Sequence, residues 1–455
     1  MIRRATRCGR VPAVRGGAGS VVALLLVLAA APAFTAERDS GGDGPRLHSS
    51  LDVGFGNVDE DAFALIYLEQ GLSWSGFELV LSGPFRLRTV DRNPRDAGVL
   101  REQDWDEPSD FARIARELRF ERDWDGGRLA LRFGELNGVG IGHGSVVDGY
   151  FNSTDMDHYQ GGAQLAGEHE GNGLEFMIEN VVAPEILAGR AFLAPIAWFS
   201  DGDWARRLTL GYTLAADISV PRHLPSAGGT RLRRTAIPVS GGDVALRLVD
   251  ASRVGVEPYF DVMVMDGDPG IHAGAATRWL LAEAEELELL LRAEYRWSGS
   301  DYHPALFGPF YDHLRRRYDR HPDTGELRSL ADHLAEEELD PAHGGLVDLV
   351  FSWGDLLRIG GRYDAEGRDR PHRLMLRLGV APSKMLDLEL FYAGRDATGG
   401  AGLFSWNSLV GASISSNLWG PLRVFADFAR RWRRANGRER MANESGAGFG
   451  VVVVY

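Results

Sequence analysis

Cysteine is nearly absent, since Cys8 is the only one in 455 residues. One cysteine excludes a disulfide framework and a cysteine-based metal site within the chain. Lysine is nearly absent too. Lys384 is the only lysine among 50 basic residues, so almost every positive charge is a planar, permanently charged guanidinium group. The apolar run at 20–34 is shorter than the about 20 residues that a membrane-spanning helix needs.

The first 33 residues have the pattern of a secretory signal peptide. Five arginines precede the apolar run, and Ala31-Pro32-Ala33 supplies a small-x-small cleavage site. We expect cleavage after Ala33. Cleavage after Ala36 and an uncleaved anchor are the alternatives. Removal of 1–33 takes away Cys8 and leaves 45 basic against 64 acidic residues, a formal charge of about −19. Nucleic acid is therefore not an expected partner, because phosphate binding needs a basic face.

The dominant pattern in the remaining chain is a period of two. In 208–220 the apolar residues Leu208, Leu210, Tyr212 and Leu214 alternate with small and polar ones, and 287–297, 373–380 and 386–392 repeat this arrangement. Alternation of this kind predicts strands with one apolar and one polar face. The segments run to 9–13 residues, the length at which a tilted strand crosses a bilayer.

The connections between these segments alternate in length. Reading back from the C-terminus, long polar connections are expected at 433–445, 394–404, 364–371 and 300–343, with tight turns at 417–421, 381–384 and 354–355 between them. Short turns on one side and long loops on the other are typical of transmembrane barrels. The count extrapolates to 16–20 strands, an even number, although 282–291 could be a short helix.

The end of the chain carries the most specific signal. Phe449, Val451 and Val453 share a face with Tyr455, the final residue. This resembles the C-terminal assembly signal of bacterial outer-membrane β-barrels. The resemblance implies an all-β, antiparallel up-and-down barrel in the outer membrane of a Gram-negative bacterium. It also implies insertion by the barrel assembly machinery into lipid and lipopolysaccharide.

In this interpretation residues 34–47 are a periplasmic segment and 48–455 form the barrel, with long loops at 83–110, 135–158, 221–242 and 300–343. Charged residues on the polar faces of the strands are the candidate pore-lining groups. They are Arg247, Arg292, Arg296, Arg373 and Arg377 with Glu257, Asp261, Glu288, Glu294, Asp387, Glu389 and Asp427.

Two loops are candidates for a constriction inside the pore. The loop at 300–343 contains Arg315, Arg316 and Arg317, which could face Glu336, Glu337 and Glu338 and create a transverse field. A solvated outer loop is the alternative. The loop at 135–158 contributes His143, Asp148, Asp155 and Asp157.

The loop at 135–158 also allows two other interpretations. Its three aspartates could bind Ca²⁺, which prefers oxygen ligands. His143 and Ser145 resemble the His-x-Ser of outer-membrane phospholipase A, which would make Asn152 an orienting residue.

The function that the sequence favours is a porin-like channel without enzymatic activity, cofactor or metal, through which small hydrophilic solutes diffuse. A non-conducting barrel that binds partners through its loops is the second hypothesis, and an outer-membrane hydrolase is the third.

Overall fold

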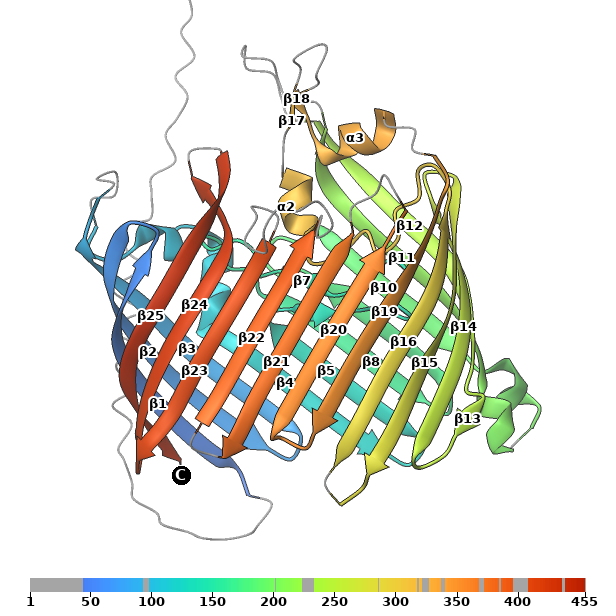
Figure 1. The fold of residues 1–455 in the computed structure, drawn as a ribbon, viewed down its shortest axis with the longest axis horizontal. Coiled ribbons are helices and arrows are strands. Elements are labelled where there is room, and N and C mark those ends of the chain that lie inside the picture. Colours follow the sequence, from blue (N-terminus) through green and yellow to red (C-terminus); the bar gives the residue numbers. More distant parts are fainter. Residues whose placement is uncertain are drawn as a thin grey trace, which may run out of the picture.

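The computed structural model describes residues 44–455 apart from 93–97, 201, 223–232, 285, 317–318, 321–326, 337–339, 368–371, 384–385, 396–407, 436–437 and 455. These residues form a closed antiparallel barrel of 20 strands (Figure 1). Each strand pairs with the next along the chain, and the last pairs with the first, with Val53 opposite Phe449. The two-residue strand β13 (Val249–Asp250) is an addition that pairs with β14 alone among the described residues.

The barrel strands follow the chain in this order: β1 (Arg46–Val58), β2 (Asp61–Trp74), β3 (Phe77–Val90), β4 (Ala115–Trp124), β5 (Gly127–Gly134), β8 (Gly162–His169), β9 (Asn172–Ile178), β10 (Ile186–Leu193), β11 (Leu208–Arg222), β12 (Arg233–Leu246), β14 (Val254–Met265), β15 (Asp268–Ala282), β16 (Leu287–Ser298), β19 (Ala342–Trp353), β20 (Leu357–Ala365), β21 (Arg373–Ser383), β22 (Leu386–Arg395), β23 (Ser408–Trp419), β24 (Leu422–Ala435) and β25 (Arg438–Val454).

The alternating pattern of the sequence becomes the two faces of the wall. On β11, Leu210, Tyr212 and Leu214 point outward and are 43–58% exposed, whereas Thr209 and Thr213 point inward and are buried. Such an apolar outer surface is stable only where lipid covers it, and a closed barrel leaves no unpaired strand edge in that lipid. The predicted all-β transmembrane barrel is therefore confirmed. No helix of the described residues is long and apolar enough to span a membrane.

The two rims of the barrel differ. One rim, called here the short-turn rim, carries two-residue turns that close on Gly76, Gly126, Gly171 and Gly420, all with φ between 53° and 80°, a conformation that glycine adopts without strain. The C-terminus lies at this rim (Figure 1). A longer connection at this rim contains the short helices η3 (Pro195–Trp198) and η4 (Asp203–Arg206). The opposite rim, the long-loop rim, carries the connections 91–114, 135–161 and 299–341.

The expected loops at 83–110, 221–242 and 433–445 are shorter than predicted, because strands continue into all three. Strand β3 continues to Val90 through Pro84, which lies opposite Tyr67, so the 83–110 connection begins later. Strand β12 occupies half of the expected 221–242 loop, because Pro238, Gly241 and Gly242 are accommodated in the sheet. Polar and glycine-containing stretches had suggested loops at both places.

The expected loop at 433–445 is also mostly strand. Strands β24 and β25 pair as far as Ala435 and Arg438 and project above the neighbouring strands (Figure 1). Their polar residues lie beyond the lipid-facing part of the wall, where an apolar face is not needed. The alternative of a helix at 282–291 is wrong, because β16 begins at Leu287.

Candidate functional site in the lumen

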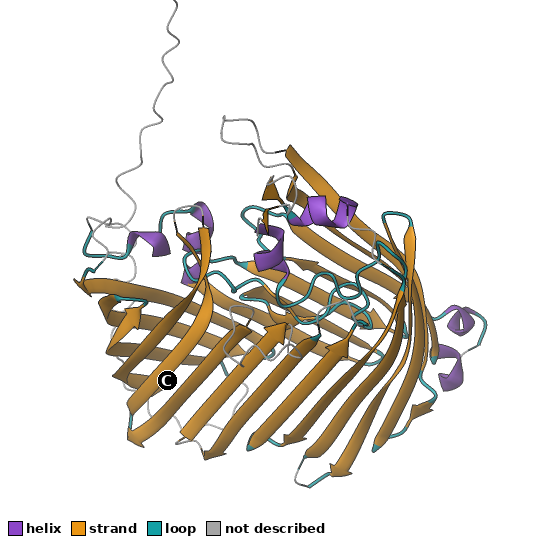
Figure 2. Ribbon diagram, turned by 45° about the horizontal axis from the view of Figure 1, so that its top comes forward, coloured by secondary structure: helices purple, strands orange, loops and turns teal. Residues whose placement is uncertain are grey.

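Residues 135–161, called here the inner segment, leave the wall after β5 and return to it at β8. On the way they contact β9, β14, β16, β20 and β24, strands that are spread around the barrel. A segment that reaches strands on several sides of a barrel must run through its interior. Figure 2 shows loops lying within the barrel near the long-loop rim.

Asp148 is the central anchor of the inner segment. Arg362 on β20 donates a hydrogen bond from Nη1 to Asp148 Oδ1 at 2.7 Å, and Arg292 on β16 donates to Oδ2. Arg296 Nη2 lies 4.0 Å from the same carboxylate. One buried carboxylate therefore ties the inner segment to neighbouring parts of the wall through charge-assisted hydrogen bonds, which are stronger than neutral ones.

His143 and Ser145 are both held by the wall residue Asp261. His143 Nδ1 lies 2.8 Å from Asp261 Oδ1, Ser145 Oγ donates to Oδ2, and the imidazole stacks on Tyr259 with ring centroids 4.1 Å apart. A nucleophilic serine would need a hydrogen bond from its hydroxyl group to the histidine, but here Ser145 and His143 both bind the carboxylate of Asp261.

Asn152 has a structural role that excludes it from a hydrolytic triad. Its side-chain amide bonds to the backbone of Leu136, Gln160 and Glu179, which leaves it no role beside His143. The phospholipase-like arrangement suggested by the sequence is not formed.

The inner segment has an apolar core that it shares with the connection after β16. Val139, Val147 and Tyr150 are almost fully buried and pack with Phe307 and Tyr311. Val147 forms a parallel bridge with Phe307. Residues 299–316, called here the support segment, thus fold inward as well and hold the inner segment from above.

The predicted arginine cluster lies at the end of the support segment, on helix α2 (Tyr311–Arg316). Arg315 forms salt bridges with Asp217 on the wall and with Glu185 of the β9–β10 connection, at 2.7 and 2.8 Å. Arg316 Nη1 lies 3.9 Å from Asp155. Apart from Asp312 on the same helix, the partners of these two arginines are therefore on the wall, the β9–β10 connection and the inner segment. Arg317, Glu337 and Glu338 lie outside the described residues.

The three aspartates considered for Ca²⁺ are not brought together. Asp148 pairs with Arg292 and Arg362, and Asp155 lies near Arg316. Asp157 is bound by Arg101 and, at 3.1 Å, by Arg433 Nε. Because each carboxylate has its own arginine partners, the three do not form a shared calcium site.

Below the inner segment, toward the short-turn rim, the lumen is hollow. Three cavities of about 570, 480 and 470 Å³ adjoin one another, with Glu389 and Asp427 lining the first two and Val350 lining the last two. The 570 Å³ cavity extends from Asp387 and Arg423, next to the short turns, to Asp155 and His158 of the inner segment. A polar water-accessible space thus reaches the inner segment from below.

Most of the candidate pore-lining charges are engaged in ion pairs or ring contacts. Arg247 pairs with Glu168 and Glu257, Glu288 with Arg278, and Arg296 with Glu294 and Asp364. Arg373 pairs with Asp364 and Glu366, and Arg377 lies against the rings of Phe151 and Phe391.

Three of the candidate carboxylates differ from the rest. Asp387, Glu389 and Asp427 line the 570 Å³ cavity, and within the described part of the chain they make no salt bridge. They lie on β22 and β24, on the same side of the barrel. A solute entering this cavity from the short-turn rim therefore meets unneutralised negative charge.

Glu179 is a buried acid that sequence reasoning missed. It lies between β9 and β10, and its carboxylate accepts hydrogen bonds from the backbone N–H groups of Glu185 and Ile186. Burial, together with the nearby Asp312 carboxylate, raises the pKa of Glu179 from 4.5 to about 8 against the effect of those backbone bonds. One signal was available, an acid within the apolar stretch 176–182, but its partners could not be read from the sequence.

No protein-family model matches the chain, and no curated protein sequence matches it. Solved structures with a similar arrangement include OccAB4 of Acinetobacter baumannii (8% identity, TM-score 0.31, 92% of this chain and 100% of the other). OpdK of Pseudomonas aeruginosa, solved with vanillate, is 9% identical with a TM-score of 0.35 over 90% and 99% of the chains. The ferric enterobactin receptor PfeA is 10% identical with a TM-score of 0.34 over 91% and 82%.

At these identities and TM-scores the similarities do not assign the chain to a family. Its class follows from its own closed sheet and apolar outer surface: it is a transmembrane β-barrel of the outer-membrane type.

Proposed function

We propose that this protein is a porin-like channel through which small hydrophilic solutes diffuse passively. The observation that carries the proposal is the hollow lumen below the inner segment, where three adjoining cavities are lined by charged side chains. A polar interior of this kind is typical of barrels that conduct water and solutes.

In this proposal the inner segment is the constriction. It carries Asp148 and His143 into the lumen, and the wall supplies Arg292 and Arg362 beside them. Charges of both signs at a narrow point select permeant solutes by charge and by the direction of their dipoles. The unneutralised carboxylates Asp387, Glu389 and Asp427 then favour cations in the approach from the short-turn rim.

Localisation and assembly belong to the same proposal. Export through a signal peptide at 1–33 would place the short-turn rim in the periplasm and the long-loop rim outside the cell. Phe449, Val451 and Val453 point outward near the C-terminus, where the assembly machinery would bind, while Tyr455 lies outside the described residues. Outer-membrane lipid and lipopolysaccharide would then cover the apolar wall.

One observation favours the alternative of a closed barrel. The inner segment is densely packed, with Leu136, Val147 and Tyr150 at zero exposure. A segment packed in this way could seal the lumen and leave the outer loops to bind a partner.

Conductance in planar lipid bilayers distinguishes the two functions. The full chain is refolded, and folding is verified by the different gel migration of unboiled and boiled samples. We expect step-like conductance in potassium chloride, with boiled protein as the control. A barrel that passes the folding test but conducts in no salt would contradict the channel and favour the closed barrel.

A further inference from the structure

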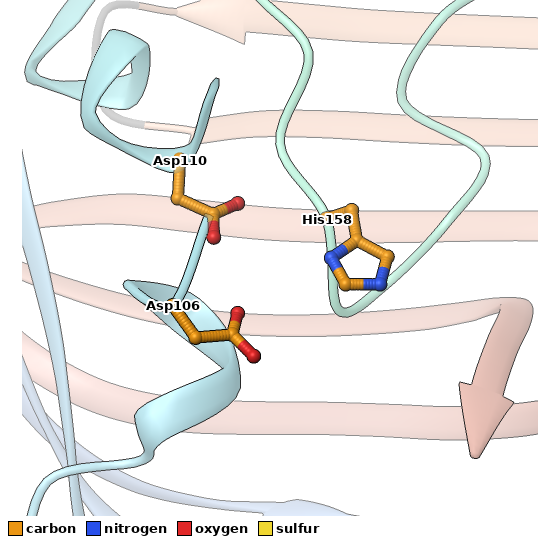
Figure 3. A group of neighbouring side chains, drawn as sticks. All are labelled: Asp106, Asp110 and His158. Carbon is orange, nitrogen blue, oxygen red and sulfur yellow. The ribbon is translucent and has the colours of Figure 1, made fainter. Parts of the chain in front are cut away.

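A group of metal-ligating side chains lies where two loops meet at the long-loop rim. Asp106 and Asp110 belong to the connection between β3 and β4, which contains the short helices η1 (Glu102–Asp104) and η2 (Pro108–Ile114). His158 belongs to the inner segment. Figure 3 shows the imidazole of His158 facing the two carboxylates. One ligand atom from each residue lies within 4.8 Å of the other two.

The hydrogen bonds around this group leave ligand positions available. Asp110 Oδ1 accepts from the backbone N–H of Tyr159 and Oδ2 from that of Glu107, both at 2.9 Å, so each oxygen keeps a second lone pair. His158 Nδ1 is buried and makes no hydrogen bond among the described residues, although the side chain as a whole is 19% exposed. The carboxylate of Glu107 lies near it, but Oε2 is 3.8 Å away, too far for a hydrogen bond. A buried ring nitrogen without a hydrogen bond is costly unless something binds it.

Charge gives a second reason for a bound cation. Two ionised carboxylates within this distance repel each other. The nearest guanidinium nitrogen on Asp110 is Arg113 Nη2, at 4.0 Å. A divalent ion between the three ligand atoms would remove the repulsion and satisfy the imidazole at once.

We propose that Asp106, Asp110 and His158 bind a divalent transition-metal ion of the Zn²⁺ type. One imidazole nitrogen and two carboxylate oxygens suit such ions, whereas Ca²⁺ requires six to eight oxygens. Asp106 is exposed, so water can complete the coordination. The ion ties the β3–β4 connection to the inner segment and restrains the latter where it returns to the wall. This site does not depend on the proposed channel function.

Titration calorimetry with Zn²⁺ on the folded full chain in detergent, at a pH where histidine is neutral, tests the site. We expect one tight site in the wild type, and affinity at least about tenfold lower in Asp106→Asn and in His158→Gln. Asp110 is left unchanged because it caps η2. His343→Gln is the matched control, since His343 bonds Tyr295 on the outer face of the wall, and it should bind as the wild type does.

Thermal stability with Zn²⁺ and the affinity for Ca²⁺ are two further readouts. Heating samples to increasing temperatures before electrophoresis gives the temperature at which the folded band converts to the unfolded one. Saturating Zn²⁺ should raise this temperature in the wild type more than in either variant, because binding stabilises the folded state. Absence of a tight Zn²⁺ site in the wild type would overturn the proposal. So would equal affinity in the wild type and both variants, or Ca²⁺ binding as tightly as Zn²⁺ with the same dependence on Asp106.

Discussion

Asp148 of the inner segment and Arg362 of the barrel wall form a salt bridge of 2.7 Å inside the lumen. The inner segment that carries Asp148 leaves the wall after β5, the fifth strand, and Arg362 lies on β20, the fifteenth of 20. The inner segment therefore crosses the lumen to a part of the wall half a circumference from where it left, and the salt bridge fixes it there. The salt bridge explains how a 27-residue excursion between Glu135 and Gly161 stays inside the barrel and does not project into solvent.

Asp148→Asn should loosen the inner segment without opening the barrel wall. The substitution leaves Arg292 without its carboxylate partner, while Arg362 keeps Asp348. Removing one member of a buried ion pair costs about 3–5 kcal/mol, and the remaining Asp348 places this variant near the lower value. Hydrogen exchange should increase in 140–150, with Asp355→Asn at an exposed turn as the control. Unchanged exchange would show that Asp148 does not hold the segment.

Neutralising Asp387, Glu389 and Asp427 together, as Asn, Gln and Asn, should reduce preference for cations. These residues line the 570 Å³ cavity and form no salt bridge among the described residues. The reversal potential in a potassium chloride gradient measures the effect. We expect the reversal potential of the triple variant to shift toward the value for an anion-selective channel, and a smaller shift in Asp355→Asn. An identical reversal potential in the triple variant and the wild type would mean that these carboxylates do not face the permeation path.

Glu179 should make stability fall as pH rises. Its pKa is about 8 in the folded barrel against 4.5 ordinarily, so between these values the folded state holds a proton that the unfolded state has released. The contribution of Glu179 to the free energy of unfolding is thus greatest below about pH 4.5 and declines until about pH 8. In the wild type, the temperature at which the folded band on a gel converts to the unfolded one should fall over this pH range. In Glu179→Gln the decline should be smaller, and an equal slope in both would count against the raised pKa.

Phe449→Arg should impair insertion. Phe449 is 61% exposed on the outer face of β25, and an arginine on the lipid face of a barrel costs about 2–4 kcal/mol near the middle of the bilayer. Val452→Arg is the control, because this position points to the lumen side of the same strand. We expect a lower folded fraction after refolding into vesicles for Phe449→Arg alone. Similar yields for both variants would argue against the assignment of the outer face.

The strands could be predicted because lipid imposes a simple pattern. Leu210, Tyr212 and Leu214 face outward on β11, as their spacing indicates, and the same rule holds on β16. The prediction failed where lipid exerts no such constraint. Pro84 and Pro238 lie within strands, and the hairpin beyond Trp432 is polar, yet pairing continues through all three places.

The candidate site could be predicted only in part. Glycines and polar residues marked 135–158 as a functional loop, and this loop does enter the lumen. Several of its partners come from strands far away in the sequence, such as Asp261 for His143 and Arg433 for Asp157. Pairings of that kind depend on how the barrel closes, so the spacing of residues within one loop carries no information about them. The group of Asp106, Asp110 and His158 was missed because its members belong to two different connections, whose approach to each other is not visible in the spacing within either one.

Single-channel conductance of the wild type and Asp148→Asn, recorded side by side in planar bilayers, tests most directly whether the inner segment is the constriction of an open channel. We predict step-like conductance in the wild type and larger, noisier steps in the variant, because the segment loses its central anchor. Equal step sizes in the two proteins, or no conductance from either correctly folded barrel, would contradict this account.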